Sequence, residues 1–197
     1  MPILRSYRTD EDGQLSFREA WYDEEVAQFV INRGPVGHLS ETPVVEDDVT
    51  PEAGEALLEA FAEACQEDGY RELGVEEQSW LYVRFPSKTA GGSPREHSLR
   101  DAVVGGLTGH LAWRGLGTVE GAVFGPQRLT IAVLTPEPKG ALKATISCLR
   151  EVAKSDLTKA VIAVAPGAEP RAAKIKHPLP AKGDFPVDDA PEAAAQG

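Results

Sequence analysis

The amino-acid sequence predicts an α+β protein built from two modules and a tail. Short segments repeat apolar residues at every second position, as half-buried strands do, and longer ones at every third or fourth position, as amphipathic helices do. The charge also changes sign along the chain. Residues 1–77 hold 5 basic and 20 acidic residues, a net charge of −15, whereas residues 78–167 hold 11 and 6, a net charge of +5. A chain of 197 residues suits one or two domains, so we expect a boundary at residue 77.

Four short strands joined by turns are expected in the first module. The second strand shows the clearest alternation, with Leu15, Phe17 and Trp21 separated by polar neighbours. Polar runs at 10–13 and 23–25 supply turns on either side of it, because short polar side chains and glycine favour turn conformations. The four predicted strands are 3–9, 14–22, 26–32 and 38–45.

A helix with clear boundaries follows these strands. Thr50 is its expected N-cap, Pro51 takes the first helical position and Gly69 ends it. An apolar stripe on one side consists of Leu57, Leu58, Phe61 and Cys65. Glutamates three or four residues apart occupy the other side, namely Glu52, Glu55, Glu59, Glu63 and Glu67. Like charges at this spacing destabilise a helix by about 0.2–0.5 kcal/mol per pair. The row is therefore either a docking face for a cationic partner or an ordinary solvated surface.

The second module is predicted to run strand, helix, strand, strand, helix, strand. Its expected strands are 79–85, 116–124, 128–134 and 160–164. The first helix begins at the capping box 93–96 and ends at Gly115, and the second covers 141–154. Three glycines inside the first helix, Gly105, Gly106 and Gly109, are explained by close packing of its backbone on the sheet. This order of elements is that of the ferredoxin-like sandwich, an antiparallel sheet with two helices on one face.

The remainder, residues 167–197, is expected to be a disordered tail. It has little apolar content and carries prolines throughout, at Pro170, Pro178, Pro180, Pro186 and Pro191. No run approaches the ~18 apolar residues of a membrane span, and the first residues lack the apolar core of a signal peptide. We therefore expect a cytoplasmic protein that does not bind membranes.

Familiar catalytic signatures are absent from the sequence. It contains no phosphate-binding loop, dinucleotide-binding glycines, nucleophile elbow, zinc-protease motif or paired cysteines. The histidines fall at no metal-ligand spacing, and Cys65 and Cys148 are expected to be inert helix residues. We predict no catalytic residue, metal or cofactor. The alternative is an enzyme with an unrecognised site around His38 or His97.

Residues 29–38, FVINRGPVGH, resemble the strand and W-G-R-V-G corner of the WGR domain, a small sheet-plus-helix module. Gly34, Val36 and Gly37 match that motif, whereas Arg33 and Pro35 replace its Trp and Arg. The resemblance implies a sheet-plus-helix fold for the first module. DNA binding does not carry over, because it requires clustered Lys and Arg and this module is acidic.

Taken as a whole, the chain shows a second and separate resemblance. WYDEE at 21–25 with GPVGH at 34–38, and HLAWRGLG at 110–117, are similar to segments of a protein group from high-GC Gram-positive bacteria. That resemblance implies a bacterial protein and no particular activity.

We therefore predict a protein-interaction or regulatory protein whose acidic first module docks a basic protein partner. An immunity-like role fits this charge pattern. The expected docking residues are Glu55, Glu59, Glu63, Trp80 and Tyr82. Trp and Tyr are common at interfaces, although the same two aromatic residues are equally expected in a core. The alternative is a nucleic-acid-binding protein that uses basic residues of the second module, namely Arg84, Lys88, Arg95, Arg100 and Arg114.

Overall fold

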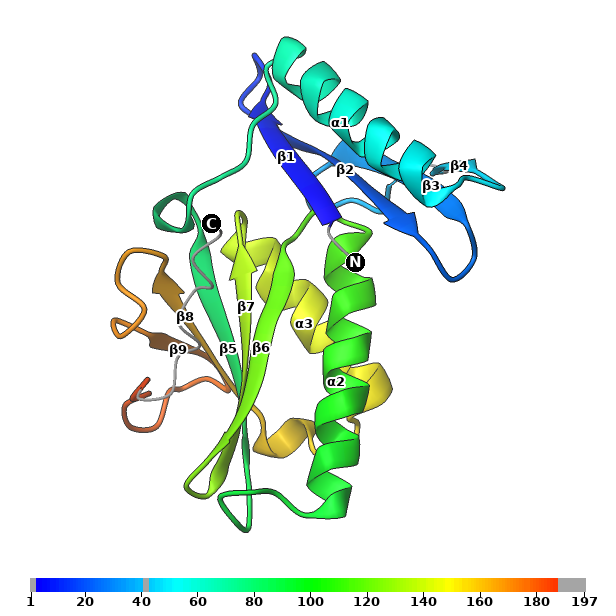
Figure 1. Cartoon of the computed structure of the whole chain (residues 1–197). Helices are drawn as coiled ribbons and strands as arrows, with labels where there is room; N and C mark the ends of the chain where they lie inside the picture. Colours follow the sequence, from blue (N-terminus) through cyan, green and yellow to red (C-terminus); the bar gives the residue numbers. More distant parts are fainter. Residues whose placement is uncertain (1–2, 41–42, 188–197) are drawn as a thin grey trace. The chain divides into compact units, whose positions relative to one another are not determined.

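The computed structural model describes residues 3–40 and 43–187, and these form a mixed α+β protein with two antiparallel sheets and three α-helices, as predicted (Figure 1). The chain divides into two compact units. Unit 1 contains the residues up to Leu73 together with the short segment Trp113–Gly115, and unit 2 contains Gly74–Ala112 and the residues from Leu116 onward.

Unit 1 begins with an antiparallel meander in the order β1-β2-β3-β4. Its strands are β1 (Ile3–Thr9), β2 (Leu15–Asp23), β3 (Gln28–Pro35) and β4 (Val44–Glu46). The fourth strand is shorter than predicted. The backbone N–H groups of Gly37 and Ser40 donate to the carbonyls of Arg114 and Trp113 instead of to β3. Two positions of the predicted strand, residues 41–42, lie outside the described residues.

Helix α1 (Pro51–Glu67) covers one face of this meander, and its predicted cap is confirmed. The Thr50 side chain accepts a hydrogen bond from the Ala53 N–H, and Pro51 occupies the first helical turn. Phe61 and Cys65 of the predicted apolar stripe are buried in one cluster with Ala20 and Phe29 of the sheet. Burial of this stripe is what holds α1 on the sheet and leaves its glutamate side facing away.

Unit 2 contains a five-stranded sheet in the order β6-β7-β5-β8-β9. Its strands are β5 (Ser79–Pro86), β6 (Thr118–Gly125), β7 (Arg128–Thr135), β8 (Val161–Pro166) and β9 (Lys174–His177). Every neighbouring pair is antiparallel, so β5 and β6 run in the same direction with β7 between them. Residues 80–83 of the central strand β5 are buried on both faces of the sheet.

Helices α2 (Pro94–Ala112) and α3 (Pro138–Val152) pack against each other and against one face of this sheet (Figure 1). The predicted capping box is present, because the Ser93 N–H donates to the Glu96 carboxylate and the Glu96 N–H donates back to the Ser93 hydroxyl. Two single-turn helices complete the described elements, η1 (Val75–Glu77) and η2 (Leu157–Lys159).

The glycine explanation for α2 requires a correction. A Cβ atom at Gly106 would lie 2.8 Å from the Cys148 Sγ and 3.0 Å from a methyl carbon of Val152, so the close neighbour is α3 and not the sheet. At Gly105 and Gly109 a Cβ atom would meet no described atom within 4 Å. One glycine of the three is therefore required for packing.

The predicted disorder after residue 167 is wrong for the part of the tail that the structure describes. Lys174–His177 forms β9 at the edge of the unit 2 sheet, and Phe185 and Val187 are buried in its core. Prolines exclude a helix here but do not prevent an extended segment from docking on a sheet. The rest of the predicted tail, residues 188–197, lies outside the described residues. Within the described residues, 3–40 and 43–187, no helix is long and apolar enough to cross a membrane.

Candidate functional site

The outer side of α1 presents the glutamate face, which we define as Glu52, Glu55, Glu59, Glu63 and Glu67. All five of these residues are exposed. Glu55, Glu59 and Glu63 follow one another at intervals of about one helical turn, so their carboxylates form a row about 12 Å long. None of these three forms an ion pair with another described residue. These three carboxylates therefore lie open to solvent without a cationic partner in the described part of the chain.

Trp80 and Tyr82, two of the expected docking residues, lie together on the unit 2 sheet face opposite α2 and α3, but they are covered. Their exposed fractions are 3% and 0%. Their rings stack with centroids 6.1 Å apart, and the Phe185 ring stacks on Tyr82 at 6.0 Å. The cover is the C-terminal strap, which we define as residues 184–187. The two aromatic residues are consequently not available to a partner while the strap is in place.

Arg84 fastens this strap. Its guanidinium carbon lies 3.7 Å from the centroid of the Phe185 ring, and an Arg84 N–H donates to the Pro186 carbonyl at 2.7 Å. A second Arg84 N–H donates to the Thr130 hydroxyl on the neighbouring strand β7. Arg84 thus holds a peptide segment instead of contributing to an open basic surface.

The other predicted basic residues do not gather with it. Lys88 and Arg95 line a pocket at the start of α2. Arg100 pairs with Asp101 at 2.7 Å and lies over the Phe124 ring, whereas Arg114 belongs to unit 1. Within unit 2, Arg84 thus lies at the strap and Lys88 and Arg95 at the pocket, and nucleic-acid binding by these residues stays a prediction.

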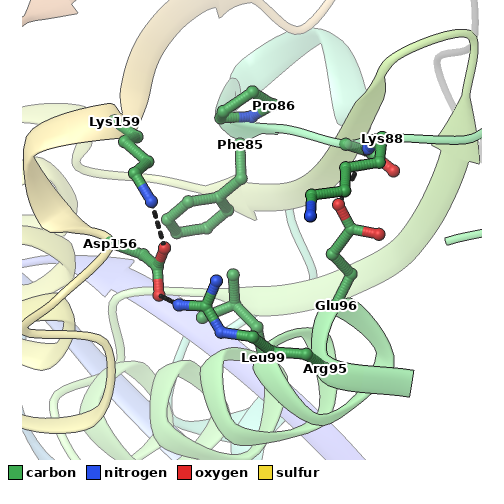
Figure 2. Close-up of a pocket in the computed structure, with 9 residues that line it drawn as sticks. Phe85, Pro86, Lys88, Arg95, Glu96, Leu99, Asp156 and Lys159 are labelled. Carbon is green, nitrogen blue, oxygen red and sulfur yellow. Dashed lines mark hydrogen bonds and ion pairs between the residues drawn. The ribbon is translucent and has the colours of Figure 1, made fainter. Parts of the chain in front are cut away.

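The pocket has a volume of about 240 Å³, smaller than the roughly 300–1,000 Å³ of typical ligand sites. Figure 2 shows Arg95 and Lys159 both reaching Asp156, with N–O distances of 2.9 and 3.0 Å. Phe85 and Leu99 form its apolar wall. The cations of the pocket are thus largely satisfied by its own carboxylate.

Both carboxylates of this pocket are held ionised. Hydrogen bonds from Ser93, and then from the Lys88 N–H, lower the pKa of Glu96 to about 2. Burial by itself would raise the pKa of Asp156, but hydrogen bonds from Lys159 and Ser155 and the charge of Arg95 outweigh it and lower that pKa. At neutral pH these groups accept hydrogen bonds and cannot act as general acids.

The two histidines named for an alternative enzyme site lie in different elements of the described structure. His38 is exposed in a loop. A ring nitrogen of His97 lies 2.8 Å from the Gly91 carbonyl, and the ring packs against Phe124. Burial raises the pKa of the Cys148 thiol to about 11, which makes this thiol inert at neutral pH. Among residues 3–40 and 43–187, no group of His, Cys, Asp or Glu could hold a metal ion.

One polar cluster went unnoticed in the sequence. On the unit 1 sheet face opposite α1, Glu19 accepts hydrogen bonds from the Arg5 guanidinium, at 2.7 Å from its Nε, and from the Asn32 amide at 2.6 Å. Arg5, Glu19 and Asn32 are cross-strand neighbours with buried side chains. Burial alone would lower the pKa of Arg5, but the Glu19 charge and hydrogen bond raise it. One signal in the sequence could have identified Glu19. It lies two residues from both Phe17 and Trp21, so it occupies the same side of the strand as these two apolar side chains.

Two features of the described structure are distinct from the pocket, namely the glutamate face of α1 and the strap-covered face of the unit 2 sheet. The pocket is small, and two of its three cations, Arg95 and Lys159, are paired with Asp156. Comparison of the chain with models of protein families, with curated proteins and with solved structures found no match.

Proposed function

We propose that this chain is a non-enzymatic regulatory protein that binds a basic protein partner through the glutamate face of α1. The observation that carries the proposal is the row Glu55, Glu59 and Glu63, which is exposed and has no cationic partner among the described residues. Regulation of the immunity type, in which an acidic protein masks a basic surface, is one form of this function.

The physical basis of the proposal is electrostatic complementarity. Glutamates at this spacing repel one another along α1 and weaken the isolated helix. A row of Lys or Arg side chains on a partner would attract these carboxylates and offset the repulsion between them. Such charge pairs chiefly accelerate association and are screened by salt, with a Debye length of about 10 Å at 0.1 M. Binding through this face should therefore weaken steeply as the salt concentration rises.

The proposal includes two finer fold assignments, one for each unit. The ferredoxin-like assignment for unit 2 draws support from the order of its elements from β5 to β8 and from the sheet order β6-β7-β5-β8, with β9 added at the edge. The WGR-like assignment for unit 1 draws support from a meander followed by α1. A cytoplasmic location stays a prediction.

The test compares two triple variants of the full chain. E55Q/E59Q/E63Q removes three charges from the glutamate face, and E11Q/E24Q/E25Q removes three from exposed turns of the same unit. Proteins captured from an extract of the source cells at ~50 mM salt are identified, and the partner is purified for affinity measurement. We expect the helix variant to bind about tenfold or more weakly than wild type, and the turn variant to bind nearly as wild type does.

Two results would contradict the proposal. Equal losses in both triple variants would mean that net charge, and not the face, attracts the partner. Unchanged affinity in E55Q/E59Q/E63Q would mean that α1 does not contact the partner at all. A partner that is a nucleic acid instead of a protein would support the basic-module alternative.

A further inference from the structure

The face of the unit 2 sheet that α2 and α3 leave uncovered is an apolar platform with a peptide seated on it. Small and aromatic side chains of β5, β7 and β8 form the platform, namely Trp80, Tyr82, Ala132, Leu134, Ala163 and Ala165. Phe185 and Val187 of the C-terminal strap are buried in the same cluster, at 5% and 6% exposure. The structure therefore displays the occupant that this face accepts.

We propose that this platform is a docking site for an extended aromatic–proline–aliphatic segment of a partner protein, and that Phe185, Pro186 and Val187 occupy it in the free chain. This site lies in unit 2 and uses apolar chemistry, so it is independent of the glutamate face in unit 1.

Arg84 gives the site its selectivity. The guanidinium lies over the Phe185 ring at 3.7 Å, and it donates to the backbone carbonyl of Pro186 at 2.7 Å. The first contact requires an aromatic side chain, and the second requires a carbonyl one residue further along the peptide. Proline between the two anchors restricts the segment to an extended form and so reduces the entropy lost on docking. The remaining platform residues are uncharged, which favours a peptide over a phosphate backbone.

The strap leaves one polar atom of the platform unsatisfied. The hydroxyl of Tyr82 is buried and has no hydrogen-bond partner among the described residues. An unpartnered buried hydroxyl destabilises the occupied state, because the group has lost its hydrogen bonds to water. A partner segment with a polar side chain that reached this hydroxyl would gain a contact that the strap does not make. The platform is thus occupied by its own chain without being fully matched to it.

The chain that leads to the strap permits it to leave. Every residue from 178 to 184 is exposed, and Leu179 near the start of this linker is 71% exposed. Release of the strap would therefore break no strand pairing of β8 with β9. A tethered segment competes at an effective concentration in the millimolar range for short linkers. A partner segment must displace the tethered strap, so the strap lowers the apparent affinity of the platform for that segment.

The experiment measures binding of a fluorescein-labelled peptide with the sequence of residues 183–187, Gly-Asp-Phe-Pro-Val, by fluorescence anisotropy. The full-length variant F185A/V187A, in which the strap loses both buried side chains, is compared with wild type and with L179A in the exposed linker. We expect F185A/V187A to bind the peptide at least about tenfold more tightly than either control, because the competing strap is weakened. Adding R84A to F185A/V187A should reduce that binding about tenfold.

Several outcomes overturn the proposal. A folded F185A/V187A variant that binds this peptide no better than a peptide with Ala in place of Phe would show that the platform accepts only its own strap. Tighter binding of a uridine oligonucleotide than of the peptide would make the platform a nucleic-acid site. If F185A/V187A fails to fold, hydrogen exchange of the unaltered protein decides: the strap amides should exchange at least about 100-fold faster than those of β5. Equal exchange rates would make the strap a fixed part of the core.

Failure here leaves the proposed function standing, and the reverse also holds. The glutamate-face variant E55Q/E59Q/E63Q should bind this peptide as wild type does.

Discussion

Each unit has a sheet with one face covered by helices, and the second faces of the two sheets are buried in opposite ways. In unit 1 the second face contains a charged network of Arg5, Glu19 and Asn32. In unit 2 it is an aromatic platform under Phe185 and Val187. A buried charge tolerates only the partner that satisfies it, whereas apolar contact is nondirectional and accepts any segment of suitable shape. The first face is therefore built to be permanent and the second can exchange its cover.

The largest expected effect comes from breaking the permanent face. Glu19→Ala leaves the buried guanidinium of Arg5 without its counter-ion and the Asn32 amide without its acceptor. We expect the free energy of unfolding of unit 1 to fall by about 3–5 kcal/mol. Urea denaturation measures it, and Glu11→Gln at an exposed turn should change it by less than about 0.5 kcal/mol. A loss below about 1 kcal/mol for Glu19→Ala would show that water already solvates this network.

A smaller loss is expected from the exchangeable face. Phe185→Ala removes a buried ring, but the strap can detach and regain conformational freedom, which limits the loss to about 2 kcal/mol, below the 3–5 kcal/mol of a fixed core Phe. Trp80 should become exposed, and its fluorescence emission should shift to longer wavelength. Leu179→Ala serves as the control in the exposed linker. A loss as large as that of Glu19→Ala would erase the distinction between the two faces.

Local signals in the sequence were sufficient for the framework of both units. The Thr50 cap with Pro51 and the 93–96 capping box are satisfied by atoms within a few residues, so their spacing alone predicts the helix starts. The alternation in β2 predicts the strand itself but not its helix-facing side, because Ala20 and Tyr22 pack in the α1 cluster and Phe17 and Trp21 do not.

The features that the sequence did not reveal depend on residues far apart in the chain. Phe185 is ordered because it meets Tyr82, and nothing in a proline-rich segment indicates that this partner exists. The same contact explains why Trp80 and Tyr82, correctly grouped on one face, are covered and not exposed. The pairing of Glu19 with Arg5 was not predicted, because it depends on strand register, which a single sequence leaves open.

Two glycines of α2 test whether the helices that cover the unit 2 sheet are packed tightly against each other. We expect this packing not to adjust to an added side chain. Gly106→Ala would place a Cβ atom 2.8 Å from the Cys148 Sγ, and we expect it to destabilise unit 2 by about 1–2 kcal/mol. Gly105→Ala meets no described atom within 4 Å and should stabilise the protein by about 0.5–1 kcal/mol through helix propensity. Thermal or urea unfolding measures both. Equal effects would mean that α2 and α3 can move apart.

The smallest effect contrasts two carboxylates, buried Glu19 and half-buried Glu96. Backbone N–H groups of Ser93 and Lys88 hold the pKa of Glu96 at about 2 in the folded chain, against about 4.3 in an unfolded one. Because the folded pKa is the lower one, the stabilisation is complete above about pH 5 and is lost as the pH falls from about 4.3 to about 2. Glu96→Gln should therefore flatten the stability profile of unit 2 in this acid range, relative to wild type and to Glu169→Gln at an exposed site. An unchanged acid slope would mean that the capping hydrogen bonds persist equally in the unfolded chain. Because solvent screens the Glu96 charge, we expect Glu96→Gln to change only the pH dependence of the free energy of unfolding. Glu19→Ala, at a buried site, should instead lower that free energy strongly.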